Sequence, residues 1–244
     1  MDKASYLSAL ATESAAIATA AEGHLDLPVP TCAEWVVADL VAHVGWVYGW
    51  VTGILASAGR PPTGGGPDAP ADRDSLLPWY GEVREKLLAD LTGHDADDPA
   101  WVFVAEAPQK VGWWYRRQAL ESTVHRFDAQ SAGGEADPID ASLAVEGIDE
   151  YLTGFLPRIT GRGRIDGLSG TLHVHATDAP GEWWLDLDAE GLAVRREHAK
   201  ADAALRGPAS GLYLWMCNRQ TVELGGVEVL GNASVVDAWR GVTF

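Results

Sequence analysis

Apolar residues along the first 160 positions recur every three or four residues, which is the spacing of a helix with one buried face. Tyr6, Leu10 and Ile17 form such a stripe over residues 3–23, and Gly23 is a suitable stop for this helix. Further helices are expected from Thr31 to about residue 57, over 74–92, through 113–128 to a stop at Gly133-Gly134, and over 140–156, ending before Pro157.

The start of the second helix carries a capping pattern. In Thr31-Cys32-Ala33-Glu34, Thr31 is expected to cap the helix and Glu34 to reach back to it. Cys32 would then lie at a helix N-terminus, which favours a thiolate, although a small packing residue fits the same position. Residues 59–72 are rich in Pro and Gly and are expected to form a loop, either a mobile flap or plain disordered surface.

Beyond about residue 166 the pattern changes to an alternation of apolar and polar positions, which is typical of antiparallel strands. Strands are expected at 170–176, 182–188 and 192–196, with a tight turn at Ala189-Glu190-Gly191. A helix from about Pro208, a short strand at 227–230 and a helix at 233–240 complete the region. We therefore predict an α+β chain, with a helical bundle in residues 1–158, a linker, and a small α+β domain in residues 166–244.

Composition narrows the classes of function. Hydrophobic residues make up 47% of the 244 residues, which is ordinary for a globular protein. The net charge of −17 argues against nucleic acid or an anionic membrane as a partner, because both require clustered Lys and Arg. Two cysteines cannot form a disulfide framework, and the polar residues within the Ala-rich run at 9–21 exclude a signal peptide or membrane span, so the cytoplasm is the expected compartment.

Candidate chemistry is concentrated in Glu121 and His125, which lie four residues apart on an expected helix. Such a pair projects from one helix face, so one metal ion could contact both side chains, although an exposed ion pair has the same spacing. His43 on the second expected helix would complete a set of two imidazoles and one carboxylate if the helices were neighbours. His43 could equally be a core residue.

For several other polar residues, both a functional and a purely structural role are possible. Asp39 and Asp128 could orient the imidazoles of His43 and His125, or they could be exposed helix charges. His173 and His175 share one face of an expected strand, but without a third ligand nearby they are expected to be ordinary sheet-face residues. Four tryptophans of the C-terminal region could line a ligand pocket or form core; these are Trp183, Trp184, Trp215 and Trp239.

Two stretches resemble the mycothiol-dependent maleylpyruvate isomerase family, which belongs to the DinB-like metal-binding helical bundles. They are Trp35-Val36-Val37-Ala38-Asp39-Leu40-Val41-Ala42-His43-Val44 and the segment from Arg116 to Ala129. The segment 201–215, with Val236-Asp237-Ala238-Trp239, resembles the sterol-carrier-like domain that follows those bundles. The resemblance implies an up-down four-helix bundle in which His43, Glu121 and His125 bind a divalent metal, expected to be zinc.

The same resemblance implies a reaction. A thiol placed on the open metal position loses its proton, so mycothiol would be held as a thiolate that adds to a small electrophile. The outcome would be cis–trans isomerisation or S-transfer, by a monomer or homodimer. The family pattern places an arginine at Arg219, the expected catalytic residue that binds a substrate carboxylate, with Arg206 as an alternative. A hydrolase that activates water at the metal and a non-catalytic lipid or small-molecule carrier remain the alternatives.

Overall fold

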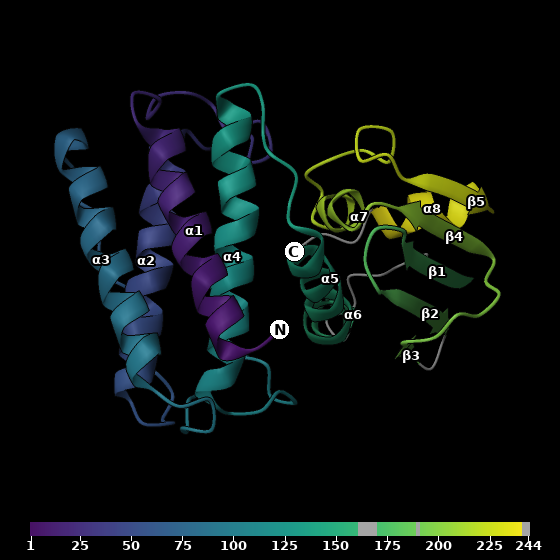
Figure 1. Ribbon diagram of the computed structural model, residues 1–244, viewed down its shortest axis with the longest axis horizontal. Helices are drawn as coiled ribbons and strands as arrows, with labels where there is room; N and C mark the ends of the chain where they lie inside the picture. The colour runs from purple at the N-terminus through teal and green to yellow at the C-terminus, as the bar shows by residue number, and fades with distance from the viewer. Residues whose placement is uncertain (161–169, 189–190, 241–244) are drawn as a thin grey trace. The chain divides into compact units, whose positions relative to one another are not determined.

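The computed structural model describes residues 1–160, 170–188 and 191–240, and its chain divides into two compact units, 1–137 and 138–244. The first unit contains four long helices that lie side by side (Figure 1). They are α1 (Lys3–Ala21), α2 (Val37–Ala56), α3 (Arg73–Gly93) and α4 (Val111–Ala132). Each helix turns an apolar stripe inward, and the expected four-helix bundle is therefore present.

The helices run up, down, down and up along the bundle. The Lys3 ammonium donates to the carbonyl of Thr92 at 3.0 Å and lies 5.3 Å from the Tyr115 ring centroid, so α1 and α4 begin where α3 ends. Arg73 pairs with Asp26 at 3.5 Å, which places the start of α3 beside the connection from α1 to α2. Helices α2 and α3 therefore run in the same direction, and the loop between them must return along the bundle.

This return loop, 57–72, is packed against α2. A Cβ atom added to Gly66 would lie 1.8 Å from the carbonyl oxygen of Trp46, and one added to Gly49 would lie 2.1 Å from the ring of Pro67. Only glycine permits backbones to approach this closely. Residues 59–72 contain no helix or strand, as expected, but close packing on α2 holds them in place.

The expected capping box at Thr31 is wrong. Residues 31–35 form turns, and α2 begins only at Val37, where Asp39 Oδ2 accepts a hydrogen bond from the amide of Val36 at 3.0 Å. The Thr31 hydroxyl instead donates to Asp128 Oδ1 at 2.6 Å, on a distant helix. Cys32 therefore does not lie at the first turn of α2, and the helix-dipole argument for its reactivity loses its basis.

The second unit combines short helices with a five-stranded sheet of order β3-β2-β1-β4-β5. The elements are α5 (Ala141–Glu150), a π-helical turn η1 (Tyr151–Phe155), α6 (Leu156–Thr160), β1 (Gly170–Ala176), β2 (Glu182–Asp188), β3 (Gly191–Arg195), β4 (Ala203–Gly207), α7 (Ala209–Met216), β5 (Glu228–Gly231) and α8 (Ala233–Arg240). Strands β1 and β4 are parallel, and the other neighbouring pairs are antiparallel. The predicted α+β class is confirmed.

Helix α5 belongs to the second unit, so the division at 137–138 comes earlier than the expected boundary at 158–166. The reason is its packing on α7: a Cβ atom on Gly147 would lie 2.3 Å from the Tyr213 ring, and the amide of Ile139 donates to Ser210 Oγ at 2.9 Å. The four tryptophans of this unit are buried, which agrees with the core reading.

The expected stop before Pro157 is also wrong, because helical structure continues to Thr160. The amide of Leu156 bonds to the carbonyl of Tyr151, five residues back, in the π-helical turn. This widened turn comes immediately before Pro157, whose ring would otherwise crowd the preceding helical turn. The expected linker residues 161–166 and turn residues 189–190 lie outside the described part of the chain. Within the described part, no helix has the length and apolarity needed to cross a membrane.

Candidate metal centre

One face of α4 carries four functional side chains at spacings of four, four and three residues. They are Arg117, Glu121, His125 and Asp128. Because α4 turns once every 3.6 residues, this spacing places all four along one stripe of the helix. His43 faces the stripe from α2, which packs beside α4 in the bundle.

Three of these residues converge on one point. Glu121 Oε1 lies 3.5 Å from His43 Nε2 and 3.3 Å from His125 Nε2, and the ligand atoms of all three lie within 4.8 Å of one another. Atoms bound about 2.0–2.1 Å from one tetrahedral zinc ion lie about 3.3–3.4 Å apart. The spacing and the nitrogen and oxygen donors therefore fit a divalent ion with a fourth position left over.

The second nitrogen of His125 is already engaged. His125 Nδ1 donates to Asp128 Oδ2 at 3.0 Å, and the side chain of Asp128 is 0% exposed. The other carboxylate oxygen of Asp128 accepts the Thr31 hydroxyl. This chain of hydrogen bonds fixes the imidazole ring with Nε2 turned toward Glu121 and His43, as outer partners do in metal sites.

The second oxygen of Glu121 is engaged in the same way, because Arg117 Nη2 forms a short ion pair with Glu121 Oε2. Burial tends to raise the pKa of Glu121, but the Arg117 charge and the hydrogen bonds from His125 and His43 hold it well below the usual value. The carboxylate is thus ionised at neutral pH, with Oε1 directed toward the imidazoles.

Neighbouring carboxylates also change the pKa of His125. Burial tends to lower the pKa of His125, but its hydrogen bonds to Asp128 and Glu121 outweigh that effect and raise the pKa to about 9. The metal-free imidazole therefore carries a proton at neutral pH. A metal ion must displace this proton to bind Nε2.

The site is open on the side of His43. The side chain of His43 is 36% exposed, whereas that of His125 is only 10% exposed. Trp35 covers both rings, with its ring centroid 5.0 Å from that of His43 and 6.4 Å from that of His125. The arrangement is a half-buried cluster of candidate ligands that is covered on one side by Trp35 and exposed to solvent at His43.

Comparisons with known proteins identify the family of the chain. The family model for the mycothiol maleylpyruvate isomerase N-terminal domain matches residues 7–130, and the model for the MDMPI C-terminal domain matches residues 142–238. The chain belongs to the mycothiol-dependent maleylpyruvate isomerase family. The resemblance noted in the sequence is therefore confirmed.

Solved structures share the fold. A crystal structure of the mycothiol-dependent maleylpyruvate isomerase superposes with a TM-score of 0.60 at 11% identity, covering 90% of each chain. A histidine-to-alanine mutant of that isomerase gives 0.63 at 11% identity, covering 94% of this chain and 93% of the other. At this identity the likeness concerns the fold alone. The comparison with curated proteins found no match.

The other residues that the sequence suggested are not part of this group of side chains. Asp39 caps α2 by accepting a hydrogen bond from the amide of Val36, and the carboxylate that His43 meets is that of Glu121. Arg219 follows α7 in the second unit, where its Nη1 donates to the carbonyl of Cys217 at 2.7 Å. Arg206 lies on β4, half exposed, and pairs with Glu228 at 3.6 Å.

Three residues of this candidate site were not predicted from the sequence: Arg117, Thr31 and Trp35. Arg117 had a usable signal, because it lies four residues before Glu121 and ion pairs form at that helical spacing. Thr31 and Trp35 had none, since their roles depend on how the turns before α2 fold over α4.

Proposed function

We propose that this family member is a zinc enzyme that uses mycothiol as its thiol and adds it to a small electrophile. His43, Glu121 and His125 would bind the ion. The observation that carries the proposal is the convergence of two imidazole nitrogens and one carboxylate oxygen at 3.3–3.5 Å. Bound zinc would supply a positive charge that deprotonates a thiol at neutral pH.

The surrounding residues have separate tasks in this proposal. Asp128 keeps His125 in the tautomer that presents Nε2, and Arg117 directs one oxygen of Glu121 away from the ligand position. Trp35 shields the two imidazoles on one side, so that the thiol approaches past the more exposed His43.

The reaction itself is an addition. The thiolate sulfur forms a bond to one carbon of a double bond conjugated to a carbonyl, and the double-bond electrons move to the carbonyl oxygen. The former double bond is now a carbon–carbon single bond and can rotate. The electrons then return from the oxygen, the double bond forms again and the thiolate leaves, which gives the trans isomer. If the adduct instead takes up a proton and leaves, the outcome is S-transfer, so one nucleophile serves both reactions.

Arg219 is the proposed carboxylate-binding residue. Its planar guanidinium can hold a carboxylate with two parallel hydrogen bonds, which a lysine cannot reproduce. Arg219→Lys should therefore raise KM for an acidic electrophile about tenfold or more, because charged hydrogen bonds contribute about 1.5–3 kcal/mol. Arg206→Lys is the matched control and should leave KM unchanged. The cytoplasm as compartment and a monomer or homodimer as assembly stay predictions.

Metal and thiol binding test the proposal together. His125→Ala should hold one zinc ion per chain fewer than the wild type, whereas the control His24→Ala, at an exposed position, should hold the wild-type amount. Titration calorimetry should detect mycothiol binding to the wild type and to His24→Ala, but not to His125→Ala. If the metal is present and mycothiol neither binds nor supports turnover, the thiol proposal fails and a hydrolase that activates water becomes the better explanation. If His125→Ala loses no metal, both enzyme proposals fail and a carrier is favoured.

A further inference from the structure

Three histidines and a glutamate gather on the sheet of the second unit. They are His173 and His175 of β1, Glu182 of β2, and His198 of the connection between β3 and β4. One ligand atom from each lies within 4.8 Å of the others. The sequence near His173 and His175 offers no third ligand, but the fold brings Glu182 and His198 close to them.

The sheet register explains why these side chains meet. His173 and His175 are two positions apart, so both point to the same face of β1. Glu182 lies directly opposite His175 in the antiparallel pair of β1 and β2. Its Oε1 accepts a short hydrogen bond from His175 Nδ1 and a second one, at 3.2 Å, from His198 Nδ1. One carboxylate oxygen thus links two imidazoles from different segments.

The connection 196–202 is held over the same face. The Trp184 indole donates to the carbonyl of Lys200 at 3.2 Å, and the guanidinium of Arg195 lies 4.2 Å from the Trp184 ring centroid. These contacts bring His198 to the sheet, with its ring centroid 4.9 Å from that of His173. The ligand positions are therefore set by the fold.

The Nε2 atom of His173 is a polar atom whose burial needs an explanation. This residue is only 7% exposed, yet its Nε2 atom is buried without a hydrogen-bond partner in the described part of the chain. A buried polar nitrogen left unpaired costs about 1–3 kcal/mol, so such atoms call for an explanation. A metal ion bound to Nε2 would remove that cost.

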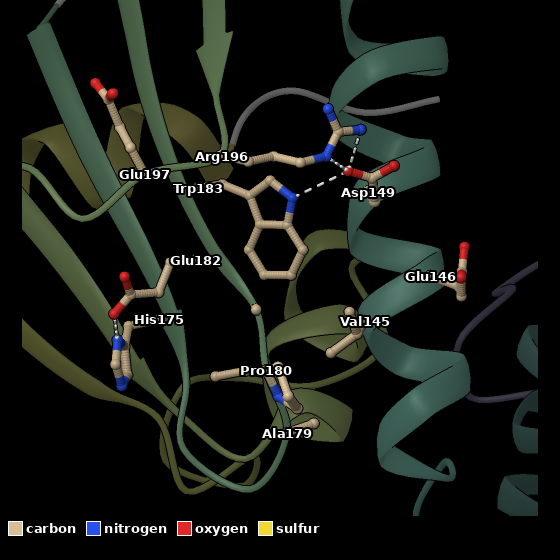
Figure 2. Close-up of a pocket in the computed structure, with 12 residues that line it drawn as sticks. Val145, Glu146, Asp149, His175, Ala179, Pro180, Glu182, Trp183, Arg196 and Glu197 are labelled. Carbon is tan, nitrogen blue, oxygen red and sulfur yellow. Dashed lines mark hydrogen bonds and ion pairs between the residues drawn. The ribbon is translucent and has the colours of Figure 1, made fainter. Parts of the chain in front are cut away.

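Two members of the cluster also line a pocket of about 660 Å³ in the second unit. His175 and Glu182 form part of its wall, and the Arg196–Asp149 ion pair and Trp183 lie across from them (Figure 2). The cluster also borders solvent at His198, whose side chain is 75% exposed.

We propose that His173, His175, Glu182 and His198 form a second metal site, specific for zinc and independent of the site at His43, Glu121 and His125. Imidazole nitrogens with one carboxylate suit zinc better than magnesium or calcium, which prefer oxygen ligands. Four protein ligands close the coordination sphere, as in structural zinc sites. The ion would therefore fasten the 196–202 connection to β1 and β2 and leave no position for a substrate.

The competing explanation is an ordinary cross-strand pair of Glu182 with His175, capped by an exposed His198. That explanation predicts no bound metal. It also leaves the Nε2 atom of His173 unexplained, because neither hydrogen bond of Glu182 involves His173.

Metal analysis can measure binding at this second site alone if the proposed ligands His43 and His125 are removed. In His43→Ala/His125→Ala, desalted protein should retain one zinc ion per chain. Addition of His198→Ala should lower zinc affinity, measured by competition with a chromogenic chelator, by at least about 100-fold, because even outer partners of a metal contribute about 10–100-fold. His198 is the safest change for folding, since its side chain is 75% exposed. His24→Ala in the same background is the matched control and should change nothing.

Two further measurements keep the test decisive. Glu182→Gln, which preserves side-chain shape but removes the charge, should weaken zinc in the same background. Zinc should slow amide hydrogen exchange in residues 196–202 of the double variant, and this protection should vanish with His198→Ala. The proposal is overturned if the double variant holds no zinc, or if its zinc affinity is the same with and without His198→Ala. If the proposed site at His43, Glu121 and His125 binds no zinc, the outcome of this test is not affected, because the test is made in a variant that lacks two of those ligands.

Discussion

Asp128 and His125 form a buried hydrogen bond at 3.0 Å, one turn apart on the same helix. The bond fixes the ring with Nε2 turned toward Glu121 and His43, so at the proposed metal site Asp128 would act on the ion through His125. We expect Asp128→Asn to lower zinc affinity at this site about 10–100-fold, as measured by chelator competition. Thr31→Val, which removes the hydroxyl bonded to Asp128, should have a smaller effect in the same direction.

Asp39→Asn provides the control for that experiment. It changes the same type of residue, but the carboxylate of Asp39 bonds to the amide of Val36 at the start of α2. We expect a loss of about 1 kcal/mol or less in the free energy of unfolding and no change in zinc affinity. Equal zinc affinities for Asp128→Asn and the wild type would contradict the orienting role.

Metal binding should release a proton. The pKa of His125 is raised to about 9 in the metal-free site, so the imidazole is protonated at neutral pH and zinc must displace that proton. Zinc affinity at this site should fall about tenfold for each pH unit below 9, because one proton competes for one nitrogen. Calorimetry of His198→Ala, in buffers of different ionisation enthalpy, should detect about one proton released per zinc ion bound. No proton release at pH 7 would refute the assignment.

The same proton affects folding of the metal-free protein. A pKa raised from 6.5 to about 9 means that the folded state binds the proton of His125 more tightly than the unfolded chain does. This stabilisation is complete below about pH 6.5 and is lost as the pH rises through about 9. Thermal unfolding of metal-free wild type should therefore lose more stability between pH 6.5 and 9 than that of His125→Asn. Identical pH profiles would argue against the shift.

The return loop offers a test of packing. Gly66→Ala would place a Cβ atom 1.8 Å from a backbone oxygen of α2, and we expect it to lower the free energy of unfolding by about 1–3 kcal/mol. Gly64→Ala, two residues earlier, meets nothing within 4 Å and should be neutral or slightly stabilising. Denaturant unfolding of both variants separates a packed loop from a disordered one, since a disordered loop would tolerate both changes equally.

A second pair of glycines tests the assignment of α5 to the second unit. Gly147→Ala would force a Cβ atom to within 2.3 Å of the Tyr213 ring, which should destabilise the second unit by about 1–3 kcal/mol. Gly154→Ala, in the π-helical turn, meets no atom within 4 Å and serves as the control. If Gly147→Ala unfolds at the same denaturant concentration as the wild type, the packing of α5 on α7 is contradicted.

Periodicity predicted most elements, because helices and strands expose their apolar spacing directly in the sequence. It failed where tertiary contacts decide. Thr31 has the pattern of a helix cap, but its hydroxyl is used by Asp128, which lies 97 residues later. Pro157 resembles a helix stop, but a π-helical turn accommodates it. The family resemblance was enough to propose His43, Glu121 and His125 as ligands. The approach of His198 to His173, in contrast, depends on strand register and a folded connection that no local pattern encodes.

The stripe on α4 has a consequence for protein engineering. Arg117, Glu121, His125 and Asp128 occupy one short helical segment, so this segment contains two of the proposed ligands together with the groups that orient them. Only His43 has to come from a neighbouring helix. The segment 117–128 is therefore a portable half-site: grafted onto an unrelated helical bundle, it would need a single facing histidine to recreate the set of donors.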